Sequence, residues 1–266
     1  MNKLFLVEPR AETKDILIGA GQVFQEISRA QVADVAAADP DAVVIVEGVG
    51  ELPAFPVQET SLKVILLLGE NDEAPDIGAA LRNHLYVLFR HPFDGESLLE
   101  AVREALATAA WSDGLRVLSA KPDWLTLAVR CRRFTAERLL RFVHELMTGI
   151  DPDERERIGT AFREIVLNGM EHGAGFDPQQ TLHVSYLRTK RFLLYSVRDP
   201  GTGFSFEANP ASALSNPPDN AVRHLQYRNE HGMRAGGFGL MLTMDLVDEL
   251  HFNEPGNEAI LIKYLS

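Results

Sequence analysis

Residues 164–172 read Glu-Ile-Val-Leu-Asn-Gly-Met-Glu-His, and two short glycine-containing segments follow them along the chain. The first is Asp199-Pro-Gly-Thr-Gly-Phe204, which begins 27 residues after His172. The second is Gly236-Gly-Phe-Gly-Leu240, which comes after a polar, turn-rich stretch. Each segment alone is a weak signal. Their order, and the elements on which they are expected to lie, make the three segments a much stronger signal together.

The first segment is predicted to lie on a helix over residues 153–172, with Asp153 as its N-cap. Apolar residues recur there at helical spacing, at Ile158, Phe162, Ile165 and Met170. Glu164, Asn168 and His172 fall at positions i, i+4 and i+8, so they are expected to share one helix face. A carboxylate, an amide oxygen and an imidazole in one row suit a site for a hydrated cation and a nucleophile. The alternative is a solvated helix face.

The second segment is predicted to follow a strand pair. Residues 182–187 and 192–197 are the two expected strands, and the polar stretch 188–191 is the turn between them. Asp199 at the end of the second strand could accept a hydrogen bond from an exocyclic amine. Gly201 and Gly203 would let a flat base approach the backbone. The alternative is an ordinary Pro-Gly turn.

The third segment is predicted to open a helix over residues 240–250. Glycines that precede a helix N-terminus expose backbone N–H groups toward a phosphate.

Together the three segments resemble the N, G1 and G2 boxes of the GHKL ATP-binding superfamily, which includes gyrase B and histidine kinases. The resemblance covers residues 115–266 and implies an α+β two-layer sandwich, the Bergerat fold, that binds ATP and Mg²⁺. It implies that Glu164 is the catalytic base, that Asn168 binds Mg²⁺, and that Asp199 recognises adenine. The other nucleotide-binding residues that it implies are His172, Gly201, Gly203, Arg234, Gly237, Gly239 and Leu240.

The resemblance implies that residues 204–236 form the ATP lid, and loops of this length are usually functional or mobile. Arg234 is one of three lid arginines that could reach a phosphate. The strand expected over residues 258–264 resembles the last strand of the family's domain, and residues 245–250 resemble the helix before it in anti-sigma-factor kinases. Residues 235–239 contain fewer alternating glycines than many family members.

A histidine kinase is a further alternative, because His144-Glu-Leu146 resembles the core of a phosphoacceptor box. His144 lies only 24 residues before Asn168, which leaves too little chain for a dimerisation hairpin and the start of the ATPase domain. Its helix, expected over residues 135–147, has a periodic apolar face. We therefore interpret His144 as a structural residue.

The first 110 residues show a different pattern, in which short apolar runs alternate with helical stretches or loops. This pattern predicts a parallel, doubly wound sheet. The runs are residues 3–7, 42–46, 63–68 and 85–89, and a helix is expected over 95–107. Their order and length resemble a response-regulator receiver domain, which has a flavodoxin-like fold. The alternative is an unrelated small α/β domain.

Residues 1–110 lack the side chains that a receiver needs for phosphorylation. A single acid, Glu8, directly follows the first run where a receiver has an acidic pair, and Glu47 occupies the place of the aspartate nucleophile. Gly69 provides no hydroxyl, and His91 replaces the usual lysine. We interpret residues 1–110 as a pseudo-receiver without a phosphorylation site, which serves for docking or dimerisation.

Composition restricts the remaining possibilities. A chain of 266 residues suits two domains, with the break expected near residues 107–118. Residues 1–110 hold 8 Lys and Arg against 18 Asp and Glu, a net charge of −10, which disfavours nucleic-acid binding. No apolar run is long enough to span a bilayer. The single cysteine, Cys131, excludes an internal disulfide, and the cytoplasm is the expected compartment.

The resemblance implies a bacterial signalling regulator similar to the serine/threonine kinases that act as anti-sigma factors. Such proteins bind a sigma factor, or phosphorylate a small antagonist protein, in partner-switching circuits. A homodimer is possible. The alternative function is an ATP-dependent protein-binding module without phosphoryl transfer, in which nucleotide sets the affinity for a partner.

Overall fold

The computed structural model describes residues 3–48, 62–108, 114–121, 123–203, 223–230 and 238–265. The chain divides into two compact units. Unit 1 comprises Met1–Gly114 with Arg141–Thr148, and unit 2 comprises Leu115–Leu140 with Gly149–Ser266. No helix within the described ranges is both long and apolar enough to cross a lipid bilayer.

Unit 1 contains a parallel sheet of five strands in the order β2-β1-β3-β4-β5. The strands are β1 (Leu4–Val7), β2 (Phe24–Ile27), β3 (Val43–Glu47), β4 (Lys63–Leu68) and β5 (Leu85–Arg90). Strands β1, β3 and β4 are buried along their whole length, as expected where helices cover both faces of a parallel sheet. The edge strand β2 was not predicted, because exposed polar residues at its centre replace a continuous apolar run.

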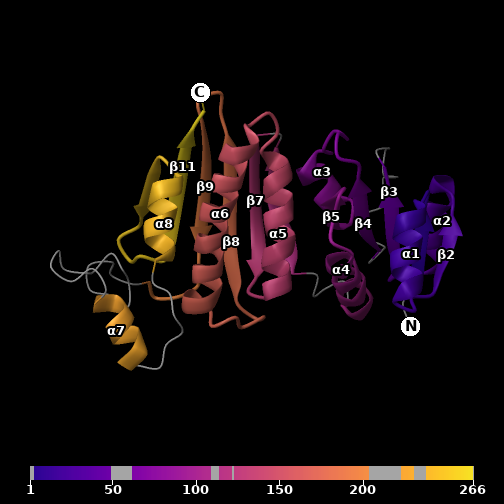
Figure 1. Cartoon of the computed structure of the whole chain (residues 1–266), viewed down its shortest axis with the longest axis horizontal. Helices are drawn as coiled ribbons and strands as arrows, with labels where there is room; N and C mark the ends of the chain where they lie inside the picture. Colours follow the sequence, from indigo (N-terminus) through magenta and orange to yellow (C-terminus); the bar gives the residue numbers. More distant parts are fainter. Residues whose placement is uncertain are drawn as a thin grey trace. The chain divides into compact units, whose positions relative to one another are not determined.

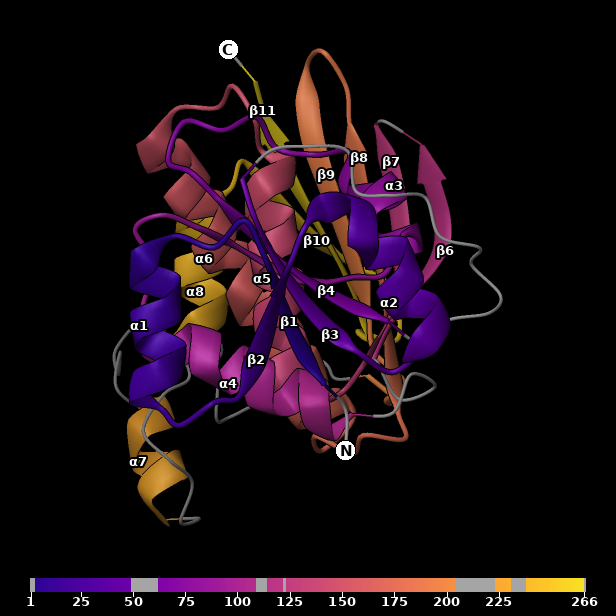
Figure 2. The same ribbon diagram turned by 90° about the vertical axis from the view of Figure 1, so that its right-hand side faces the viewer.

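The described residues of unit 1 include four α-helices beside this sheet: α1 (Ala11–Gly19), α2 (Val32–Ala38), α3 (Ile77–Arg82) and α4 (Gly95–Ala107). A 3₁₀ turn, Arg29–Gln31, precedes α2. Helices α1 and α4 lie together on one face, and α2 and α3 lie on the other (Figure 2). The bounds of α4 agree with the prediction, since Asp94 caps it by accepting a hydrogen bond of 2.9 Å from the backbone N–H of Ser97.

Unit 2 contains an antiparallel sheet of six strands in the order β10-β11-β9-β8-β7-β6. The strands are β6 (Leu115–Lys121), β7 (Trp124–Arg130), β8 (Thr181–Arg188), β9 (Phe192–Arg198), β10 (Glu249–Phe252) and β11 (Glu258–Tyr264). The sequence analysis predicted β8, β9 and β11, and it missed the other three. The mixture of a parallel sheet in unit 1 and an antiparallel sheet with helices in unit 2 confirms the α/β class.

The described helices of unit 2 are α5 (Arg133–Leu146), α6 (Pro152–Asn168), α7 (Arg223–Glu230) and α8 (Gly239–Leu246), although Arg141–Thr148 groups with unit 1. Helices α6 and α8 pack side by side against one face of the sheet (Figure 1). Every second residue of β8 and β9 is buried beneath them. Phe162 of α6 contacts Tyr195 of β9, with ring centroids 5.0 Å apart.

Two predicted helices of unit 2 need correction. Asp151 rather than Asp153 caps α6, because its carboxylate accepts hydrogen bonds from the first-turn N–H groups and Pro152 occupies the first helical position. The helix predicted over residues 240–250 is also longer than the helix that the structure contains. α8 ends at Leu246, and the helix predicted over 245–250 is wrong, because Glu249–Phe252 pairs with β11 as a strand.

Candidate functional site

The carboxyl end of α6 lies beside the amino end of α8, which places parts of the first and third segments in contact. A Cβ atom added to Gly239 would overlap the Oε2 atom of Glu164. The same Cβ would lie 3.9 Å from the Nδ2 atom of Asn168. Glu164 and Asn168 are both partly exposed, one helical turn apart. The absence of a side chain at Gly239 therefore allows these two polar groups to reach the start of α8.

Asp199 brings the second segment to the same end of α6. The backbone N–H of Gly201 donates to its Oδ1 atom at 2.8 Å. A Cβ added to Gly173 would overlap the Asp199 carboxylate, and one added to Gly169 would lie 3.4 Å from the Asp199 Cβ. These glycines are thus required for the approach of Asp199 to the helix. Burial raises the pKa of the Asp199 carboxyl above its ordinary value, although the N–H of Gly201 opposes the shift.

The turn between β10 and β11 supports Asp199, and the sequence analysis missed this role. The backbone N–H of Asp199 donates to the carbonyl oxygen of Asn257 at 2.9 Å. The Asn257 side-chain amide donates to the carbonyl oxygen of Gly201 at 2.9 Å. Asn253 holds the turn, because its Oδ1 atom accepts three backbone hydrogen bonds of 3.0 Å. Gly203, at φ +84°, packs so closely on Pro255 that a Cβ would overlap the Pro255 carbonyl oxygen.

His172 does not continue the row formed by Glu164 and Asn168. α6 ends at Asn168, and residues Gly169–Gly173 form a single π-helical turn. A π turn is wider than an α turn, so the expected i, i+8 alignment is lost. The His172 side chain is exposed. The prediction of a continuous helix over 153–172 was therefore wrong at its carboxyl end.

The backbone N–H groups in the first turn of α8 have no N-cap side chain that accepts hydrogen bonds from them. Phe238 is the N-cap residue, and no side-chain hydrogen bond caps the helix there. An N-terminus of this kind attracts anions, because several N–H groups and the helix dipole point outward. The other end of α8 is tied to α6, since the Arg157 guanidinium donates to the carbonyl oxygen of Asp245 at 3.0 Å.

Several predicted residues of the lid and third segment lie outside the described structure. Arg234, Gly237 and the flanking ranges 204–222 and 231–237 belong to this group. Within the predicted lid, the structure describes the helix α7. Leu240, in the first turn of α8, is partly exposed.

A comparison with protein-family models gives one match to this architecture. The model of the histidine kinase-like ATPase domain matches residues 131–263, half of the chain. The chain belongs to this family. Its matched region includes α6, Asp199 and α8, so the segments that meet in the structure all lie within the histidine kinase-like ATPase domain. Membership implies ATP binding, which generally requires Mg²⁺ in such domains. No curated protein shows a match to the chain.

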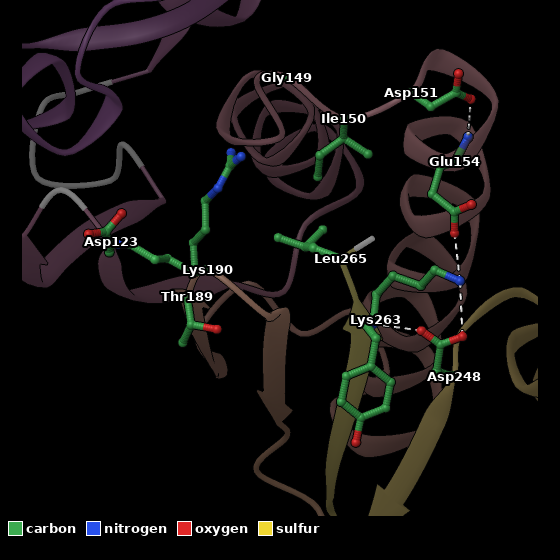
Figure 3. A pocket seen from close by; sticks show the side chains of 12 residues that line it. Asp123, Gly149, Ile150, Asp151, Glu154, Thr189, Lys190, Asp248, Lys263 and Leu265 are labelled. Carbon is green, nitrogen blue, oxygen red and sulfur yellow. Dashed lines mark hydrogen bonds and ion pairs between the residues drawn. The ribbon is translucent and has the colours of Figure 1, made fainter.

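A hollow of about 970 Å³ lies at the opposite ends of α6 and β9 from these residues (Figure 3). Lys263 of β11 points toward two carboxylates on its wall. Its Nζ atom lies 2.6 Å from Glu154 Oε1 and 3.0 Å from Asp248 Oδ1. Burial opposes the charge of Lys263, but the two carboxylates raise its pKa overall. This cluster joins the start of α6 to the sheet, and Glu164, Asn168 and Asp199 lie at the other end of the helix.

The position of Gly239 gives a first prediction. Gly239→Ala should lower ATP turnover by about 10- to 100-fold, because its methyl group would displace the Glu164 carboxylate from the start of α8. The free energy of unfolding should change little, since the displaced atom ends a flexible side chain. Steady-state ATP turnover and chemical denaturation would measure the two effects. Gly159→Ala is the matched control, because a Cβ on that α6 glycine meets nothing within 4 Å. Equal ATP turnover in Gly239→Ala and Gly159→Ala would contradict the placement of the Glu164 carboxylate beside the start of α8.

Proposed function

We propose that this protein is an ATP-dependent signalling regulator of the anti-sigma-factor serine/threonine kinase type. One observation carries the proposal: Glu164 and Asn168, near the carboxyl end of α6, face the start of α8, and Asp199 packs on the turn that follows α6. Adenine and phosphates would thus bind at two neighbouring places around one helix end.

Each proposed role follows from the chemistry of its side chain. Asp199 would accept a hydrogen bond from the exocyclic amine of adenine, since its carboxylate is held by the backbone N–H of Gly201 and its own backbone N–H is held by the carbonyl oxygen of Asn257. The amino end of α8 would receive the phosphates. Glu164 would take the proton from the hydroxyl group of the phosphoryl acceptor.

The side chains of α6 that face the start of α8 also fit Mg²⁺. Magnesium prefers oxygen ligands and is usually held by one or two protein groups together with phosphates and water. The Asn168 side chain carries an amide oxygen one helical turn from the Glu164 carboxylate, and Gly239 leaves room between both side chains and the start of α8. When bound, the ion would neutralise phosphate charge. Gly201, Gly203 and Leu240 would border the nucleotide, with His172, Arg234 and Gly237 as further proposed contacts.

Unit 1 is proposed to be a receiver-like module for docking or dimerisation. The strand order β2-β1-β3-β4-β5 with helices on both faces supports a flavodoxin-like fold. Residues 1–110 and 115–266 would then be separate domains, and the lid would span 204–236. We place the protein in the cytoplasm, with a sigma factor or a small antagonist protein as its partner.

The proposal is tested by incubating the protein with labelled ATP, Mg²⁺ and the proteins encoded beside it. We expect acid-stable label on a serine or threonine of one of these proteins. ATP-dependent binding without label would favour the alternative, a nucleotide-controlled binding module, which the thin glycine run of residues 235–239 supports. Acid-labile label on His144 of this protein would instead indicate a histidine kinase.

A further inference from the structure

A buried carboxylate lies at the carboxyl end of the unit 1 sheet. Glu47 is the last residue of β3, and only 4% of its surface is exposed. Its Oε2 atom accepts hydrogen bonds from the backbone N–H of Arg10 at 2.7 Å and from the Thr13 hydroxyl at 2.9 Å. Thr13 is itself fully buried. One oxygen of the carboxylate is thus held by the first turn of α1.

The other oxygen faces two basic side chains. The His91 Nε2 atom lies 3.1 Å from Glu47 Oε1, and the Arg10 Nε atom lies 3.2 Å from it. His91 follows β5, two strands from β3 in the sheet. The carboxylate therefore links the end of β3, the start of α1 and the segment after β5.

These donors form the kind of environment that binds an oxyanion. A carboxylate removed from water is costly unless charged and hydrogen-bonding partners surround it. Glu47 has a guanidinium, an imidazole, a hydroxyl and a backbone N–H, and the N-terminus of the nine-residue helix α1 adds a favourable dipole. Open parallel sheets bind ligands at this edge, where the strand order reverses between β1 and β3.

We propose that the carboxyl end of the unit 1 sheet is an oxyanion-binding pocket that the protein fills with its own Glu47 carboxylate. The donors that would bind an external carboxylate or phosphate already bind the Glu47 carboxylate. Unit 1 is thereby fixed in a single liganded conformation, and it accepts a small oxyanion only when Glu47 is removed. This inference concerns unit 1 alone, so its failure would leave the proposed ATP site unaffected.

The experiment removes the internal ligand and supplies an external one to the full-length protein. Glu47→Ala should speed backbone hydrogen exchange in α1 and in the segment after β5 by about tenfold or more, because buried donors lose their acceptor. Formate, acetate or phosphate should restore protection in a saturable way, since a ligand that binds the folded state stabilises it. Sodium chloride at equal ionic strength should not. The wild-type protein should show no such response.

Glu8→Ala is the matched control, since Glu8 follows the neighbouring strand β1, is exposed, and pairs with Arg29 at 2.8 Å. It should show no anion-dependent protection. The proposal is overturned if Glu47→Ala keeps wild-type protection without added anion, or if formate, acetate and phosphate all fail to restore it. If Glu47→Ala does not fold, Glu47→Gln decides the matter. That variant should exchange faster than wild type, and equal exchange would show that no anion is needed.

Discussion

Glu164→Gln is expected to lower phosphoryl transfer or ATP hydrolysis by about 10²- to 10⁴-fold, the usual contribution of a general base. The amide keeps the size of the carboxylate at the start of α8, and Gly239 still leaves room for it. ATP affinity should therefore remain nearly unchanged. Turnover kinetics and calorimetric titration with nucleotide would separate the two quantities.

Glu156→Gln is the matched control, because Glu156 is an exposed carboxylate elsewhere on α6. It should behave like the wild-type protein in both measurements. Equal activity in Glu164→Gln and wild type would remove Glu164 from the mechanism. The nucleotide-controlled binding module would then be the better account of this chain.

Asp199→Asn is expected to weaken ATP binding by about 1–3 kcal/mol, the range for loss of a hydrogen bond to a charged group. An asparagine can still accept the bond from Gly201, so the loop should keep its conformation. Its amide nitrogen, however, cannot accept a bond from the amine of adenine. Calorimetry with ATP and ADP would measure the loss, which should be similar for both nucleotides.

Asp177→Asn is a suitable control for this variant, because Asp177 is an exposed aspartate that binds a backbone N–H within its own turn.

The raised pKa of Asp199 also predicts that ATP binding depends on pH. Since burial raises that pKa, acidification should protonate Asp199 above the ordinary titration range of aspartate. Affinity for ATP should then fall in wild type, and it should fall less in Asp199→Asn. Unchanged affinity of Asp199→Asn would contradict the adenine role.

Local sequence patterns were sufficient for several elements of the fold. The limits of α4 and β11 agree with prediction, and those of β8 and β9 differ by one residue at some ends. These elements have strong periodicity and clear turn or capping residues at their ends. Short apolar runs likewise located four strands of unit 1.

The missed features depend on residues that are far apart in the sequence. Residues 245–250 mix acidic and apolar side chains as a helix does, yet pairing with β11 makes Glu249–Phe252 a strand. The π-helical turn after Asn168 coincides with the close approach of Asp199, which no local pattern reveals. Tertiary pairing overrides local propensity in both places.

In the candidate site, too, local patterns predicted some residues, and contacts between distant residues were missed. Motif spacing predicted Glu164, Asn168 and Asp199 as site residues, and the structure brings them to the same end of α6. It missed Asn257, which supports the Asp199 loop by binding Gly201 at a separation of 56 residues. The signal available in the sequence was two asparagines flanking a Glu-Pro-Gly turn, and such a turn alone indicates only a reversal of the chain.

Calorimetric titration of the wild-type protein with ATP in the presence of Mg²⁺ tests the central claim most directly. The account predicts saturable binding of one nucleotide per chain, weakened by Asp199→Asn and retained by Glu164→Gln. Absence of ATP and ADP binding at millimolar nucleotide would contradict it.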